Sequence, residues 1–148
     1  MCDILLLGRL PLSVASLAIS ADSINALQIR NILVQLPNLN DLSLSGSLST
    51  MDKDALRGIG TALRGNFGGQ LRLVKKHAVT DVVNMLLDAP TGLNFTEVDV
   101  LATHECLLPT KKLSEACGES LVKLTYSVDC FCESHARLAR AAVSLKLR

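Results

Sequence analysis

The chain has 148 residues, of which 49% are hydrophobic and 20% charged, and its formal net charge is +1. A chain of this length and composition buries a core, which excludes a disordered protein. The balanced charge gives no general electrostatic reason to expect binding to nucleic acid or to an anionic membrane. Aromatic residues make up only 3%, so the core must be built mainly from Leu, Val, Ile and Ala.

The N-terminal segment shows no sign of an export signal. The apolar run at residues 4–7 is short for a signal peptide, and Asp3 stands where such signals carry basic residues. No stretch approaches the ~20 apolar residues that a membrane helix needs. The five cysteines lack the ladder of spacings of a secreted disulfide scaffold. We therefore expect an intracellular protein, cytoplasmic or nuclear, with reduced cysteines.

Five segments share a pattern in which two large apolar residues flank a residue that is usually small or polar. This alternation predicts strands with one buried face. Their first residues lie 22 to 31 positions apart (from 71 to 93 and from 93 to 124), which straddles the ~20–29-residue period of leucine-rich repeats. The clearest copy, LPNLNDLSL at residues 36–44, fits the pattern LxxLxxLxL. The five segments are residues 17–19, 42–44, 71–73, 93–95 and 124–126.

A helix is predicted in each interval between these segments. The first carries apolar residues at spacings i, i+3, i+4 and i+7 from Ile29 to Leu36, with Ser23 as a candidate N-cap. The second runs through Leu56, Ile59 and Leu63, from a capping box at Ser49 and Asp52 to Gly65.

Two further helices are expected in the later intervals. One opens at Thr80 and Asp81 and runs to Leu87, before Pro90. The other is short, with Thr110 as its candidate cap and Gly118 at its end.

The alternation of strand and helix predicts an α/β fold, a leucine-rich-repeat-like solenoid whose short parallel sheet is backed by helices, over residues 1–132. We expect the segments at 42–44, 71–73, 93–95 and 124–126 to be adjacent parallel strands. The residues expected to point inward are Leu42, Leu44, Leu71, Leu73, Leu93, Phe95 and Leu124.

Several segments also carry a family resemblance. LPNLNDLSLSGSL, GIGTALRGNFGGQLRLV, DVVNMLLDAPTGLNFTEVDV, THECLLP and EACGESLVKLTYSV resemble, in this order, the leucine-rich-repeat region of fungal F-box-type proteins. The likeness covers approximately residues 25–130. In that family an N-terminal F-box docks to a ubiquitin-ligase core and the repeats hold a target protein. We find no F-box-like helical segment before Leu17. The resemblance implies a binding surface and no catalytic residue.

The last segment, ESHARLARAAVSLKLR at residues 133–148, is predicted to be a basic amphipathic C-terminal helix or tail. Leu138, Ala141, Ala142 and Leu145 would share one helical face. The principal expectation is that it caps the last repeat. The alternative is a helix that binds a membrane surface or a partner, since a basic apolar pattern also suits that use.

No group of residues makes a convincing catalytic or metal site. Cys130, Cys132 and His135 are potential zinc ligands, but a one-residue gap is poor for chelation and no fourth ligand is evident. We therefore expect no metal, no cofactor and no enzyme activity. The glycine-rich loop at residues 65–69 is predicted to be a turn into a strand. Glu97 and Asp99 are expected just past a strand, facing solvent.

The expected function is non-catalytic protein–protein recognition by outward strand residues, as in the target-recognition part of a ubiquitin-ligase adaptor. Arg72 and Lys123 are the strongest candidates for contact with a partner's carboxylate. The alternative is a truncated or divergent repeat fragment that only self-associates. The candidate partner surface comprises Asp41, Ser43, Gln70, Arg72, Asn94, Lys123 and Thr125.

Overall fold

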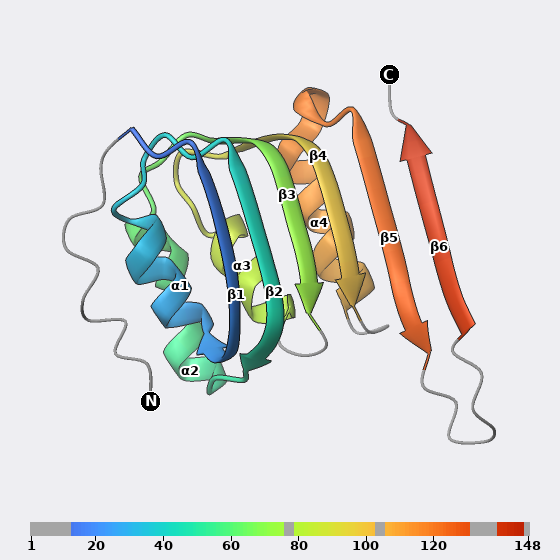
Figure 1. Cartoon of the computed structure of the whole chain (residues 1–148). Helices are drawn as coiled ribbons and strands as arrows, with labels where there is room; N and C mark the ends of the chain where they lie inside the picture. Colours follow the sequence, from blue (N-terminus) through green and yellow to red (C-terminus); the bar gives the residue numbers. More distant parts are fainter. Residues whose placement is uncertain (1–12, 76–78, 103–105, 131–138, 147–148) are drawn as a thin grey trace.

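The structure, a computed structural model, describes residues 13–75, 79–102, 106–130 and 139–146. Within them, six strands form one sheet whose spatial order is the order of the chain (Figure 1). β1 to β5 are parallel, and β6 is antiparallel to β5. The strands are β1 Ser16–Asn25, β2 Asp41–Ser49, β3 Phe67–Lys75, β4 Leu93–Ala102, β5 Lys123–Cys130 and β6 Ala139–Lys146.

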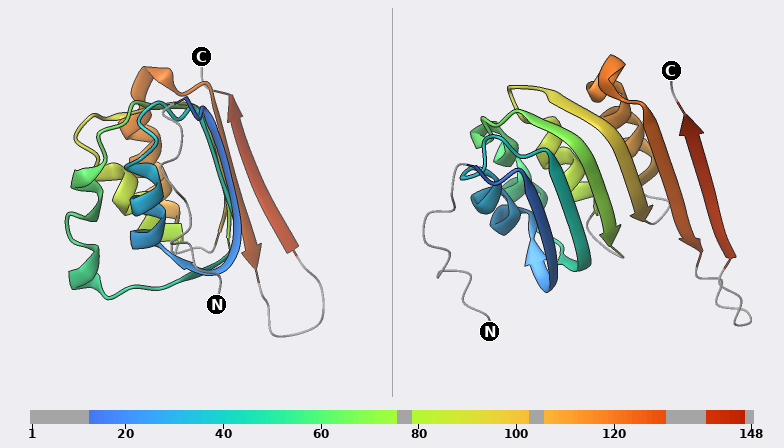
Figure 2. Two further views of the ribbon diagram at one scale, coloured as in Figure 1. Left: turned by 60° about the vertical axis from the view of Figure 1, so that its left-hand side comes forward. Right: turned by 45° about the horizontal axis from the view of Figure 1, so that its top comes forward.

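Helices occupy the intervals between the parallel strands and lie on one side of the sheet, as both views in Figure 2 show. The fold is therefore an α/β fold with a parallel sheet backed by helices, as predicted. The described helices are α1 Ala26–Leu33, α2 Lys53–Leu56, α3 Val79–Leu87 and α4 Leu107–Cys117, with short 3-10 turns η2 Ile59–Ala62 and η4 Gly118–Ser120.

The core lies between the sheet and the helices. Leu42, Leu44, Leu71 and Leu73 are at most 1% exposed, as expected for inward positions of β2 and β3. Leu93 and Phe95 are buried too, whereas Leu124 is only partly buried. The predicted adjacency and parallel direction of β2, β3, β4 and β5 are both confirmed.

The alignment of β4 with its neighbours differs from the repeat pattern. Phe67 pairs with Leu93 and Gly69 with Phe95, but the register then shifts, and Leu71 pairs with Val98. Thr96 is the extra residue of β4, because Gly69 pairs with Phe95 and the next residue, Gln70, pairs with Glu97. This bulge realigns the strand, because one extra residue moves later side chains to the other face. The inward pair level with Leu71 and Leu73 is therefore Val98 and Val100.

The helix ends correct several expectations. α1 is capped by Asn25 rather than Ser23, because Asn25 and Gln28 accept hydrogen bonds from each other's backbone N–H at 2.9 and 3.0 Å. Thr110 lies inside α4 and is buried, so it is not the cap. α4 does end at Gly118, whose positive φ of 53° suits glycine.

The second predicted helix is divided into two short turns, α2 and η2. Gly58 lies between them with φ 64°, a left-handed conformation that ends a helix. The Asp52 side chain makes no capping hydrogen bond. Two turns therefore replace the predicted continuous helix.

The predicted C-terminal helix is wrong over Ala139–Lys146, which form β6. β6 pairs with β5 from Lys123↔Lys146 to Cys130↔Ala139. Pairing satisfies backbone groups along an edge of β5 that a helix would leave unpaired. Residues 133–138 and 147–148, which belong to the same predicted segment, lie outside the described residues.

Among the residues that the structure describes, no helix is both long enough and apolar enough to span a membrane.

Leu44 provides a direct test of the core, because its side chain is fully buried. We expect Leu44→Ala to lower the free energy of unfolding by about 2–5 kcal/mol, since both transfer free energy and packing are lost. Ser47→Ala, at an exposed position of the same strand, should change it by less than about 0.5 kcal/mol. Chemical denaturation of both variants measures the difference. An unchanged midpoint in Leu44→Ala would contradict the inward orientation.

Candidate functional site

The face of the sheet opposite the helices carries two rows of residues that run across β1 to β5. Each row is defined by direct strand pairing, so its members come from five separate segments of the chain. The first row consists of Ser16, Asp41, Gln70, Glu97 and Lys123. The second row consists of Ala18, Ser43, Arg72, Asp99 and Thr125.

Polar contacts connect the first row from β2 to β5. The Gln70 backbone N–H donates to Oδ1 of Asp41 at 3.2 Å, and the Gln70 side-chain amide donates to Oε2 of Glu97 at 3.3 Å. The ammonium of Lys123 lies 3.6 Å from the same oxygen of Glu97. Glu97 therefore joins β3 to β5.

The second row contains an ion pair between β3 and β4. Nε of Arg72 lies 3.6 Å from Oδ2 of Asp99, with the side chains 58% and 37% exposed. An ion pair this exposed contributes at most about 1 kcal/mol, because water screens it and two mobile side chains must be held. The pair fixes no rigid geometry, but it compensates the charge of Arg72.

The two cations expected to contact a partner are thus both paired within the sheet. Their partners, Glu97 and Asp99, were expected beyond the strand but lie within β4 on its outward face. The bulge at Thr96 and Glu97 explains why these acids were expected outside the strand. The alternation of apolar and polar residues is interrupted there, but β4 continues beyond the bulge. The acids opposite Arg72 and Lys123 were the signal that sequence analysis missed.

Asn94 belongs to a separate polar group near the start of the strands. Its side-chain amide donates to Oδ1 of Asn66 at 2.9 Å, and Oγ of Ser120 donates to Oδ1 of Asn94 at 3.5 Å. Asn94 is opposite Gly68, two positions before Gln70 in β3. The other six predicted surface residues lie in the two rows, and Asn94 lies outside them.

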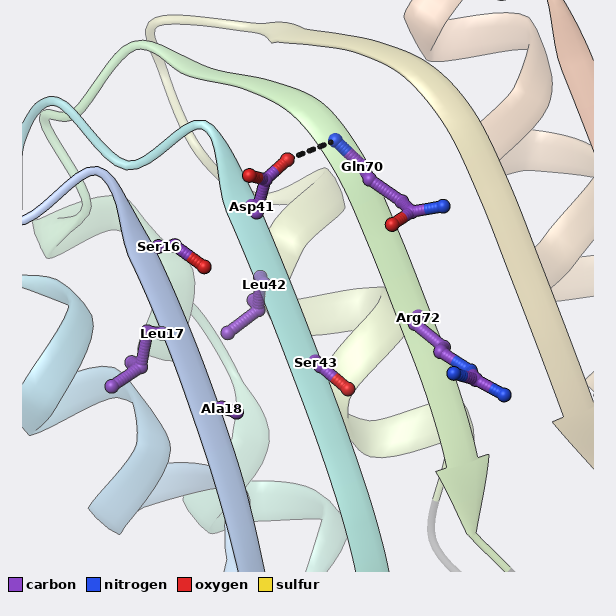
Figure 3. A pocket seen from close by; sticks show the side chains of 8 residues that line it. All are labelled: Ser16, Leu17, Ala18, Asp41, Leu42, Ser43, Gln70 and Arg72. Atoms are coloured by element: carbon purple, nitrogen blue, oxygen red, sulfur yellow. Dashed lines mark hydrogen bonds between the residues drawn. The ribbon is translucent and has the colours of Figure 1, made fainter.

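An open depression of about 210 Å³ lies over β1, β2 and β3 (Figure 3). Its centre carries the small side chains of Ala18 and Ser43, and Gln70 and Arg72 rise beside it on β3. The hollow results from this difference in side-chain length between neighbouring strands. It is lined by Ser16, Leu17, Ala18, Asp41, Leu42, Ser43, Gln70 and Arg72.

Three groups with raised pKa values lie away from this face. Burial raises the pKa of the Asp81 carboxyl, opposed by a hydrogen bond from the Met51 backbone N–H at 3.4 Å. Burial also raises the pKa of the Cys117 thiol. The pKa of the Tyr126 hydroxyl is raised by burial and, to a smaller extent, by charge repulsion from the nearby Cys106. These residues belong to the core and the helical layer, so their pKa values identify no acid or base on the outward face.

No metal site is evident in the part of the chain that the structure describes, where no group of three or more His, Cys, Asp or Glu residues is placed to hold an ion. Of the zinc ligands considered from sequence, Cys130 ends β5, and Cys132 and His135 lie outside the described residues. Comparison of the chain with protein-family models, curated proteins and solved structures found no significant match.

Gly69 lies where β3 enters the outward face, and we expect a substitution there to lower stability more than the same substitution at its neighbour Gly68. Its φ is +66°, and a Cβ at this position would collide with the carbonyl oxygen of Asn40. We expect Gly69→Ala to destabilise the protein by about 2 kcal/mol or more, through both backbone strain and the clash. It should also move the Gln70 amide away from Asp41. Thermal denaturation and the NMR shift of that amide provide the readouts.

Gly68→Ala is the matched control, because a Cβ there would meet only the Asn94 carbonyl oxygen, at 3.5 Å. It should cost less than about 1 kcal/mol. Equal destabilisation by the two substitutions would contradict the special role of Gly69.

We predict that the chain binds no structural zinc, because Cys130, Cys132 and His135 lack a fourth ligand of suitable spacing. Elemental analysis of tag-free protein should find less than about one zinc per ten chains, since a structural site is filled stoichiometrically. Stoichiometric zinc that disappears in Cys130→Ser would show the prediction to be wrong.

Proposed function

We propose that the chain is a non-catalytic protein-recognition module whose binding surface is the outward face of β1 to β5. The observation that supports this most is the alignment of polar side chains from five strands into two rows beside an open depression. A surface assembled from successive parallel strands offers many positions at a fixed spacing, which suits the recognition of an extended partner.

The proposal includes a leucine-rich-repeat-like solenoid. Its support is that the strands follow one another across the sheet in chain order, with a helix or helical turn in each parallel crossover. Together with the resemblance to the repeats of fungal F-box-type proteins, this supports a role as the target-recognition part of a ubiquitin-ligase adaptor. The bound target would then be a protein.

A second candidate function is self-association through the sheet edge. β1 is the terminal strand of the sheet, and no described strand pairs with its other edge. Leu17 and Ile19 on this strand remain only partly buried against the core. An exposed strand edge is a template for pairing with another chain. Sedimentation of the protein over a range of concentrations separates this function from target recognition by a monomer.

Filling the depression tests the main proposal. Ser43→Tyr introduces a large side chain at the centre of the outward face without changing the charge, and tyrosine is well tolerated in strands. The variant should fold normally and lose at least about tenfold of its affinity for partners of the parent protein, the loss expected when a well-packed contact is blocked. Quantitative co-purification with mass spectrometry, followed by a binding titration, measures the loss.

Ala116→Tyr is the matched control, because Ala116 is an exposed small residue on α4 in the helical layer. Its partners should match those of the parent in identity and affinity. If Ser43→Tyr also retains every partner, the outward face is not the binding surface.

A further inference from the structure

The charges on the outward face divide it into two halves. Among the described side chains of the β3–β5 half, the cations Arg72 and Lys123 are each paired with an acid of β4, Arg72 with Asp99 and Lys123 with Glu97. In the β1–β2 half, Asp22 and Asp41 are exposed carboxylates with no cation partner among the described side chains. The described side chains of β3–β5 are therefore neutral in sum, and those of β1–β2 are acidic.

The depression covers part of the acidic half, including Asp41, and extends onto β3. Oδ1 of this carboxylate accepts the Gln70 backbone N–H, and no described group hydrogen-bonds to its Oδ2. The hydroxyls of Ser16 and Ser43 line the same hollow (Figure 3). Carboxylate and hydroxyl oxygens accept hydrogen bonds, so they suit a ligand that donates several of them.

Of the residues that the structure describes, Arg72 is the one cation that lines the depression, and its side chain is turned toward β4 (Figure 3). Nε of Arg72 lies 3.6 Å from the Asp99 carboxylate, which compensates its charge. The charge left within the hollow is that of Asp41. An anionic ligand would meet this carboxylate, whereas a cationic ligand would compensate it.

We propose that the depression binds an arginine or lysine side chain of the protein partner, with Asp41 as the counter-charge. The Ser16 and Ser43 hydroxyls accept further hydrogen bonds from the cation, and the Ala18 methyl lies beneath its aliphatic stem. This inference rests on the proposed protein-recognition function and adds the chemistry of the partner. It reverses the expectation that Arg72 and Lys123 would contact a partner's carboxylate.

The test uses three short peptides as probes of the whole chain. Acetyl-Gly-Arg-Gly-amide carries the cation, the citrulline analogue keeps its shape without the charge, and acetyl-Gly-Asp-Gly-amide carries the opposite charge. Each is titrated at low ionic strength, where exposed charge pairs are least screened, and followed by amide shifts in the NMR spectrum. The arginine peptide should produce saturable shifts at residues 16–18 and 41–43 and should bind tighter than the other two.

Variants separate the two charges in the hollow. Asp41→Asn should weaken binding of the arginine peptide about threefold to fivefold, the effect of one exposed charge pair. Asp54→Asn, at an exposed position of α2 in the helical layer, should leave it unchanged. Arg72→Ala should not weaken it, because the guanidinium is not a ligand of the cation.

The outcomes distinguish this inference from the function on which it rests. Tighter binding of the aspartate peptide, no saturable shifts with the arginine peptide, or an unchanged affinity in Asp41→Asn would each overturn the inference. If partners are lost from Ser43→Tyr while the arginine peptide does not bind, the recognition function stands and the cation pocket is wrong. If the peptide binds but every partner survives Ser43→Tyr, the hollow holds adventitious cations only, and both proposals fall.

Discussion

The register of the parallel strands is the constraint on which the other features depend. It places large apolar side chains directly beside one another on neighbouring strands, so that they form two columns that pack against the helices. Hydrophobic burial fixes this register, because a slip of one residue would move a strand's apolar set to the solvent face. The first column consists of Leu17, Leu42, Leu71, Val98 and Leu124, and the second of Ile19, Leu44, Leu73, Val100 and Tyr126.

The same register determines the outward face, because the residues between these apolar positions must form rows as well. Sequence analysis could predict which residues of β2, β3 and β5 point outward, since strict alternation specifies their faces. It could not predict that Arg72 and Lys123 are paired, because the acids opposite them follow a bulge in β4. The contrast between the neutral and acidic halves therefore emerges only from the three-dimensional pairing. The charge pairs on this surface join residues of different strands, so no single segment of the chain reveals them.

The fold was predictable where one periodicity dominated a segment. α1 and α3 carry apolar residues at helical spacing, and β2 alternates Leu42 and Leu44 with polar residues. Ala139–Lys146 fit both periods, because Ala141, Val143 and Leu145 alternate with other residues while alanine and arginine favour a helix. Their pairing with β5 is a tertiary interaction that local propensity does not contain. The division of the second helix at Gly58 has a similar origin, since a left-handed glycine there overrides the apolar spacing of Leu56 and Ile59.

The pairing of β3 with β4 tests the account most directly, because the repeat pattern and the structure assign different partners to Leu71. Equal alignment of the repeats would place it opposite Leu93, whereas the bulge places it opposite Val98. Interstrand nuclear Overhauser effects between backbone protons, measured by NMR on isotope-labelled protein, distinguish the two registers. The register with the bulge predicts contacts of Leu71 with Val98 and of Arg72 with Asp99. Contacts of Leu71 with Leu93 instead would separate Arg72 from Asp99 and contradict the charge arrangement of the outward face.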